Sequence, residues 1–141
     1  MLLEQNLAKR LEALEIDKNE KVSNVYNPIA YAEETHLAFL KKFMNGKKKI
    51  LFLGMNTGPW GMAQTGVPFG EVGMVKEFLK IDGNVDKPKN EHPKRPILGL
   101  KCTRREISGE RLWTLFKEVC GSPRIFRVVC NLQPLPAFIS C

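Results

Sequence analysis

The fold of this chain is decided by the stretch Ile50-Leu51-Phe52-Leu53-Gly54-Met55-Asn56-Thr57-Gly58-Pro59. Its first four residues are all apolar, which predicts a strand buried on both faces, as the central strand of a parallel sheet is. Gly54 marks the point where the strand ends and a loop begins. We therefore expect an α/β fold, in which helices flank a parallel sheet and this loop lies at the carboxyl end of a central strand.

Helical patterns lie on both sides of this strand in the sequence. Leucines at helical spacing over residues 3–14 predict an amphipathic helix within an N-terminal region of residues 1–21. A second helix is predicted between the Asn27-Pro28 turn and Asn45-Gly46, with an apolar side formed by Tyr31, His36, Phe39, Leu40 and Phe43. A short helix is predicted over residues 74–79, and a longer one runs from a Ser108 cap to Gly121 with an inner face of Leu112, Leu115, Phe116 and Val119. Residues 97–100 and 125–130 are predicted to be strands.

The composition is that of one ordinary globular domain. The chain has 141 residues, 43% hydrophobic and 26% charged, with no internal repeat and no stretch apolar enough to span a bilayer. The net charge of +7 favours an anionic partner, either nucleic acid or an acidic membrane surface. The four cysteines form no Cys-x-x-Cys pair, so no zinc site is expected. Because the chain starts without a secretory signal, we expect reduced thiols inside a cell.

The loop after the central strand is where a functional site is expected. Open α/β sheets bind ligands beyond the carboxyl ends of their strands, and the connection over residues 54–73 is long and rich in glycine. Asn56 offers an amide donor and a carbonyl acceptor without a charge, which allows it to hold and orient a water molecule. The alternative is that residues 54–59 form only a tight turn, since Asn and Gly are common turn residues.

The continuation of this loop carries a resemblance to a known family. Residues 61–72 are Gly-Met-Ala-Gln-Thr-Gly-Val-Pro-Phe-Gly-Glu-Val, and together with residues 54–59 they resemble the single-strand-selective monofunctional uracil-DNA glycosylases. Further similar segments are Val25-Tyr26-Asn27-Pro28, Glu91-His92-Pro93-Lys94-Arg95-Pro96, and Ser108-Gly109 ahead of Trp113. The resemblance covers residues 22–126.

The resemblance implies an enzyme of base-excision repair that flips uracil out of DNA and hydrolyses its N-glycosidic bond. The implied fold is a three-layer α/β fold, and no metal or organic cofactor is implied. In such an enzyme the residue matching Asn56 positions the attacking water, the backbone at Met55 holds the base, and the aromatic matching Phe69 stacks on uracil. The expected substrates are uracil and 5-oxidised uracils in single- and double-stranded DNA, and the expected protein is a nuclear monomer.

Several further residues are assigned by the same resemblance, each with an alternative. Gly58, Pro59, Lys94 and Arg95 are expected to contact DNA, whereas charges of this kind are often only a solvated surface. Asn131 is expected to bind the uracil edge through its amide, and chance similarity is the alternative there. Phe69 would otherwise be a core residue.

The chain also departs from the family pattern. Thr57 stands where Pro is usual and Trp60 where Phe is common; Thr57 frees the φ angle of the loop, which would re-aim Asn56. Residues 127–141 form a divergent tail, and the family's C-terminal half, with its His-Pro-Ser-Pro motif and DNA-inserting wedge, has no counterpart. We therefore expect a single partial domain over residues 1–141, with one sheet edge and apolar surface uncovered. The alternative function is that of a catalytically impaired, truncated isoform that binds only DNA or a partner.

Overall fold

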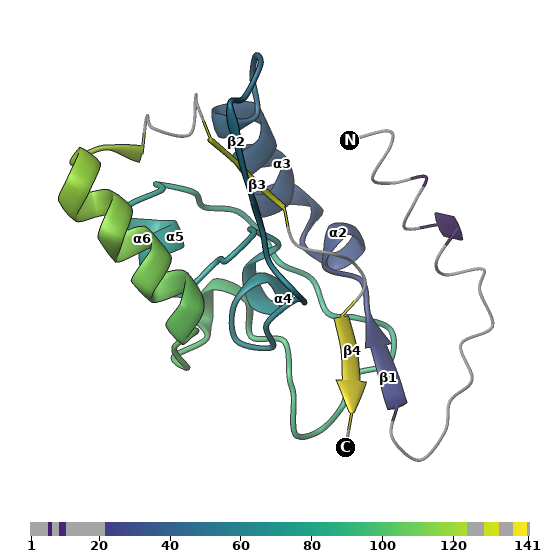
Figure 1. Cartoon of the computed structure of the whole chain (residues 1–141). Coiled ribbons are helices and arrows are strands. Elements are labelled where there is room, and N and C mark those ends of the chain that lie inside the picture. Colours follow the sequence, from purple (N-terminus) through teal and green to yellow (C-terminus); the bar gives the residue numbers. More distant parts are fainter. Residues whose placement is uncertain (1–5, 7–8, 11–21, 124–128, 133–136, 141) are drawn as a thin grey trace.

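A computed structural model describes residues 6, 9–10, 22–123, 129–132 and 137–140 (Figure 1). The strands are β1 (Val22–Tyr26), β2 (Ile50–Leu53), β3 (Val129–Leu132) and β4 (Ala137–Ser140). The helices are α2 (Pro28–Tyr31), α3 (Glu33–Phe43), α4 (Met62–Thr65), α5 (Val72–Glu77) and α6 (Ile107–Cys120), with a 3-10 turn, η1, at Gly99–Lys101. The predicted helix over residues 3–14 and much of the tail after residue 126 lie outside the described residues.

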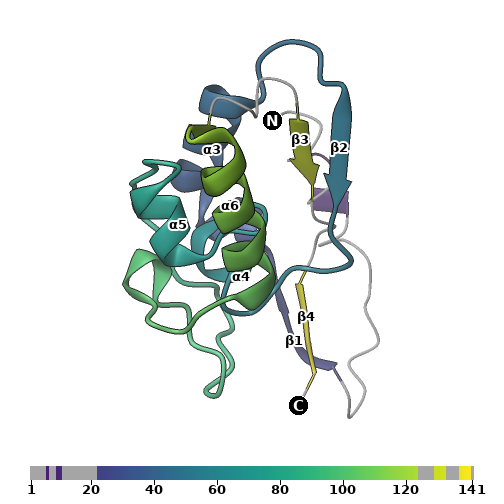
Figure 2. The same ribbon diagram turned by 60° about the vertical axis from the view of Figure 1, so that its left-hand side comes forward.

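The strands form two pairs. β2 and β3 are parallel, with Ile50 opposite Val129 and Leu53 opposite Leu132, whereas β1 and β4 are antiparallel. Figure 2 shows α3, α5 and α6 on one side of the molecule and β2 with β3 on the other. The mixture of helix and strand is confirmed, and the strand expected over residues 125–130 is observed at Val129–Leu132.

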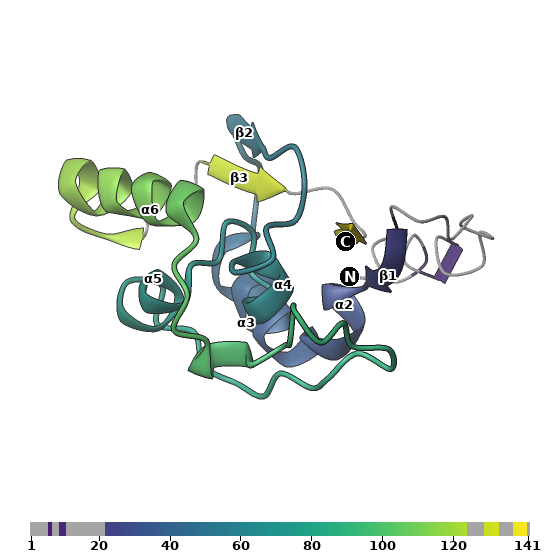
Figure 3. The same cartoon turned by 90° about the horizontal axis from the view of Figure 1, so that it is seen from below.

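The main core lies between α3, α5 and α6. It is built from buried aromatic and aliphatic side chains: Phe39, Phe43, Val67, Val75, Phe78, Leu79, Ile81, Trp113 and Phe116. Helix α3 presents Phe39 and Phe43 to this core, as the sequence predicts, with their rings 5.3 Å apart. Seen from below (Figure 3), α5 and α6 lie at one end of the molecule and β1 lies at the other.

The prediction that β2 is buried on both faces is wrong. Ile50, Leu51 and Leu53 are 51%, 55% and 71% exposed, and Phe52 packs inward with its ring 5.6 Å from that of Phe116. These exposed fractions show that, among the described residues, no second layer covers the outer face of β2, which also pairs with a single strand there. The expectation that apolar surface would be left uncovered is therefore confirmed.

The predicted cap of α6 is wrong: the cap is Glu106, whose carboxylate accepts hydrogen bonds from the backbone N–H groups of Ser108 and Gly109. The predicted inner face is correct in part. Phe116 is buried and Leu112 packs against the core, as expected, with Trp113 beside them, whereas Leu115 and Val119 are 54% and 72% exposed. Residues four and three apart share a helix face, so burial of Trp113 carries Leu115 to the opposite side. Gly121 ends α6 with φ of 61°, as predicted.

The predicted strand over residues 97–100 is wrong as well. This segment contains the 3-10 turn η1, and Gly99 has a left-handed φ of 59°. A strand requires φ near −120°, which Gly99 does not adopt here. A Cβ atom at this position would approach the side chain of Val85 within 2.9 Å, so the glycine also permits close packing.

Candidate functional site

The loop that follows β2 presents its predicted site residues to solvent. Met55 is 90% exposed and Asn56 is exposed, whereas Thr57 beside them is buried with 5% exposure. The chain then passes Gly58 and enters α4 at residue 62. The loop is therefore anchored at Thr57 and in α4, and the amide of Asn56 remains accessible to a ligand or water.

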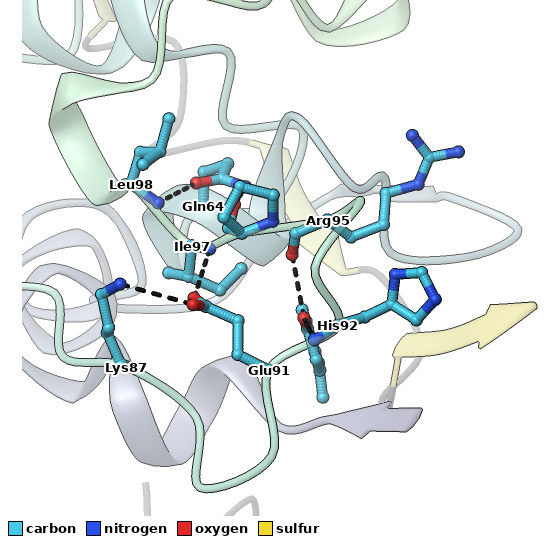
Figure 4. A network of polar contacts seen from close by, with 9 residues as sticks. Gln64, Lys87, Glu91, His92, Arg95, Ile97 and Leu98 are labelled. Carbon is cyan, nitrogen blue, oxygen red and sulfur yellow. Dashed lines mark hydrogen bonds and ion pairs between the residues drawn. The ribbon is translucent and has the colours of Figure 1, made fainter. Parts of the chain in front are cut away.

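Gln64, the third residue of α4, links this loop to the segment that carries the predicted DNA contacts. Its fully buried amide donates to the carbonyl oxygens of Pro59 and Pro96, both at 3.0 Å, and accepts from the N–H of Leu98 at 2.8 Å. Figure 4 shows Gln64 beside Ile97 and Leu98 at the end of that segment. One buried amide therefore fixes both segments relative to each other.

The turn over residues 92–95 is held by Tyr26. The Tyr26 hydroxyl accepts a hydrogen bond from the N–H of His92 at 2.7 Å and donates to the carbonyl of Arg95 at 2.8 Å. Burial raises the pKa of Tyr26, and the charge of Glu91 raises it further. Glu91 itself accepts from the N–H of Ile97 at 2.7 Å. With its backbone held in this way, the turn directs the Arg95 guanidinium away from the network (Figure 4).

Phe69 adopts a conformation that the surrounding structure has to maintain. Its φ is 51°, a left-handed value that is uncommon for a residue other than glycine. Its carbonyl accepts hydrogen bonds from Trp113 Nε1 at 2.7 Å and from the N–H of Glu71 at 2.8 Å. The half-buried side chain packs against the main core. Backbone strain that is maintained in this way is typical of functional sites. The contacts of the side chain with the main core are those of the alternative role, in which Phe69 is a core residue.

The first turn of α6 contacts both segments that carry predicted site residues. A Cβ atom added to Gly58 or Gly61 would approach Cγ of Glu106 within 3.3 Å or 2.7 Å. A Cβ atom added to Gly109 would collide with the carbonyl oxygen of Phe69 and lie 2.6 Å from Glu106 Oε2. The glycines thus allow the loop after β2 and the backbone at Phe69 to lie close against one helix end.

The remaining predicted site residues are Arg95, Lys94 and Asn131, and of these Arg95 contacts the loop that follows β2. Arg95 lies over the ring of Trp60, 5.3 Å from its centroid, and Trp60 directly follows Gly58 and Pro59 in the sequence. Lys94 is exposed, with its backbone N–H donating to His92 Nδ1 at 3.1 Å. Asn131 lies in β3, where its backbone is opposite Phe52, and its side chain lies outside the description.

Three features of this region are not singled out by the sequence patterns: the Gln64 link, the Glu106 cap and a second arginine, Arg104, over Trp60 at 4.4 Å. Gln64 lies inside the glycine-rich motif, but its type does not signal burial. Within the described residues, no cluster of three or more His, Cys, Asp and Glu side chains is placed to bind a metal. In the same part of the chain, none of the helices has both the length and the apolar composition to cross a membrane.

The described residues form a protein of mixed helix and strand, in which a parallel strand pair is followed by an exposed loop that carries the amide of Asn56. Comparison with known proteins then specifies the relatives. The chain is 48% identical over 136 residues to the single-strand selective monofunctional uracil-DNA glycosylases of Rattus norvegicus, Bos taurus and Mus musculus.

This similarity extends over 94% of the chain, which spans about half the length of the curated relatives it matches, 49% to 50%. No family model matches the chain. The resemblance found in the sequence is thereby confirmed, and the chain is related to these glycosylases across nearly all of its own length.

Proposed function

We propose that this chain is a monofunctional uracil-DNA glycosylase that hydrolyses the bond between uracil and deoxyribose. The observation that carries the proposal is the 48% identity to named uracil-DNA glycosylases over 94% of the chain. The exposed Asn56 in the loop after β2 supports it, because an accessible neutral amide is suited to positioning water.

The proposed chemistry depends on a placed water and on electrostatic stabilisation. As the C1′–N1 bond breaks, positive charge develops on deoxyribose and negative charge on the base. The carbonyl oxygen of Asn56 accepts a hydrogen bond from the water, whose oxygen then attacks C1′. Uracil departs as an anion with the bonding electron pair, and the water oxygen forms the new bond to C1′. The proton that the water loses passes to bulk solvent, from which the released uracil anion is protonated. A metal or organic cofactor has no place in this scheme.

Further residues bind the base and the DNA in this proposal. The backbone at Met55 holds the flipped base, Phe69 stacks on it, and the amide of Asn131 binds its edge. Stacking on one aromatic ring contributes about 1 to 3 kcal/mol, which offsets part of the cost of unstacking the base. The loop at Gly58 and Pro59, with Lys94 and Arg95, contacts the DNA backbone.

The finer assignments follow the same relationship. The fold is a three-layer α/β fold around the β2–β3 pair, and the protein acts as a monomer in the nucleus. Its substrates are uracil and 5-oxidised uracils in single- and double-stranded DNA. The formal charge of +7 supports DNA as the partner, because phosphate binding favours a basic protein.

The test is uracil release from labelled single-stranded DNA by the purified chain, with a far-ultraviolet circular dichroism spectrum to confirm folding. Asn56→Ala is expected to lower the rate about a hundredfold or more, since an oriented group in the transition state contributes on this scale. Asn45→Ala is the matched control, because within the described residues its exposed amide donates to the local carbonyl of Lys41 alone, at 2.7 Å. Equal rates for Asn56→Ala and the unaltered chain would refute the assignment of the water to Asn56.

A second candidate is a DNA-binding protein that does not excise uracil. It is favoured by the exposure of the region: Met55 is 90% exposed and Leu53 is 71% exposed, whereas a flipped base requires a close-fitting, desolvated pocket. Salt-dependent DNA binding by a folded chain that releases no uracil would support this candidate over the glycosylase.

A further inference from the structure

Two arginines lie over one tryptophan ring beside the loop that follows β2. The guanidinium carbon of Arg104 is 4.4 Å from the centroid of the Trp60 ring, and that of Arg95 is 5.3 Å from it. Arg104 is exposed, and the other two residues are half-buried. We call these three side chains the Trp60 cluster. Two positive charges therefore lie beside one aromatic ring.

Neither arginine of the Trp60 cluster forms a direct ion pair within the described residues. The carboxylate near this loop, that of Glu106, accepts instead from the backbone N–H groups of Ser108 and Gly109. The adjacent Arg105 differs, because its guanidinium forms a two-point contact with the carboxylate of Glu110. A guanidinium that has no carboxylate partner keeps its N–H groups available to bind an anion, so Arg95 and Arg104 are suited to this and Arg105 is not.

The aromatic ring explains how the cluster presents donors to an anion. A guanidinium that lies over a ring gains cation–π attraction while the N–H groups at its edge remain available. Those edges match the oxygens of a phosphate and can donate two parallel hydrogen bonds. The Trp60 ring thus holds Arg104 in one orientation before any ligand binds.

The position of the cluster connects it to the predicted site. Trp60 lies in the same loop as Asn56, and that loop is tied through Pro59 to the buried amide of Gln64. Gln64 also binds the carbonyl of Pro96, next to Arg95. An anion bound by the cluster would consequently sit at a fixed position relative to Asn56.

We propose that the Trp60 cluster is a phosphate-binding contact for the DNA strand beside the excised nucleotide, with Arg104 as its main donor and Trp60 as its support. The identification of the anion as DNA rests on the proposed function. The assignment of these particular residues rests on the geometry of the cluster, in which two arginines without a direct ion pair among the described residues lie over one ring.

The test measures binding of a fluorescein-labelled, uracil-free single-stranded oligonucleotide by fluorescence anisotropy, as a function of salt. Arg104→Ala is expected to weaken binding about threefold to tenfold and to reduce the slope of log affinity against log salt by about 0.7, the value of one single-strand phosphate contact. Arg105→Ala is the matched control and should leave both unchanged, because Glu110 already neutralises it. Arg104→Lys should keep the slope and recover only part of the affinity.

Trp60→Leu tests the role of the ring. It is expected to weaken binding without altering the slope, and to cause a smaller loss in an Arg104→Ala background, where only Arg95 remains over the ring. Equal effects of Arg104→Ala and Arg105→Ala, an unchanged slope for Arg104→Ala, or no measurable binding by the unaltered chain at low salt would each overturn the inference. Uracil release measured in parallel separates the two proposals: release with unaltered slopes refutes only the cluster, and altered slopes without release refute only the glycosylase.

Discussion

Replacement of Gly109 by alanine should disturb the contact between α6 and Phe69. In the structure, a Cβ atom at Gly109 would collide with the carbonyl oxygen of Phe69 and approach Glu106 Oε2 within 2.6 Å. The first of these groups is backbone and cannot rotate away. The helix and the Phe69 segment must therefore move apart, which also lengthens the 2.7 Å hydrogen bond from Trp113 Nε1 to the same carbonyl.

The size of the effect follows from three contributions. Overpacking costs about 1 to 3 kcal/mol, and a buried indole N–H left without its acceptor costs about 1 to 3 kcal/mol more. Alanine improves helix propensity by about 1 kcal/mol, which offsets part of this. We expect Gly109→Ala to lower the free energy of unfolding by about 1 to 5 kcal/mol, with about 3 kcal/mol as the central value. For a chain of this size, the central value corresponds to a fall in Tm of roughly 8 to 15 °C.

Thermal unfolding followed by circular dichroism measures this loss, and near-ultraviolet circular dichroism reports the environment of Trp113. The matched control is Ser108→Ala. Because Glu106 caps the helix and Ser108 is exposed, this change should stay within about 0.5 kcal/mol of the unaltered chain. A Gly109→Ala variant that is as stable as the unaltered chain, or a Ser108→Ala variant that loses as much, would refute the reasoning about this helix end.

Two further changes test buried polar groups. The hydroxyl of Tyr31 donates to the carbonyl of Ala63 at 2.7 Å, and burial raises its pKa, so the folded state keeps the proton that the unfolded chain releases above pH about 10. The stabilisation from Tyr31 is fully present below that pH, and above it the free energy of unfolding falls by up to about 1.4 kcal/mol per pH unit. Urea unfolding at pH 8 to 11 should therefore show a smaller loss of stability with rising pH for Tyr31→Phe than for the unaltered chain. The same loss in both proteins would show that Tyr31 is not its cause. Gln64→Leu should cost about 2 to 4 kcal/mol, because the carbonyls of Pro59 and Pro96 lose their donor; a urea midpoint near that of the unaltered chain would contradict the link.

The elements that the sequence predicts correctly are those with a strong local pattern. The apolar spacing of Phe39 and Phe43 identifies α3, and the β2 strand is where Ile50–Leu53 predicts it. Burial of β2 is not a local property, since it depends on which segments cover the strand. An unbroken apolar run predicts the strand but cannot supply its second layer, and so Leu51 and Leu53 are exposed.

The helix end at α6 was predicted incorrectly for a different reason. Ser is a preferred capping residue and Glu is not, so Ser108 is the expected cap from propensity. Glu106 occupies that position because its side chain lies in a space left by Gly58 and Gly61, residues more than forty positions away in the sequence. Tertiary packing therefore overrides the local preference, and no pattern within residues 104–110 reports it.

In the predicted site, too, the local sequence predicts the type of segment in which each residue lies, whereas contacts between distant segments decide where the residues lie relative to one another. The motif places Asn56, Phe69 and Arg95 in loops, which the structure confirms, but their relative positions depend on Gln64, Trp60 and the first turn of α6.

Each of these groups connects segments that are distant in the sequence. Each does so through a property that the residue type alone does not reveal: burial of an amide, contact of one ring with two cations, or a glycine that permits close approach. Changes at these connecting residues should alter catalysis or DNA binding without touching the base. Variants at Gln64 and Gly109 are therefore expected to reduce uracil release together with stability, whereas Arg104→Ala should reduce DNA affinity at unchanged stability, because Arg104 is exposed and supports no other segment by a side-chain hydrogen bond within the described residues.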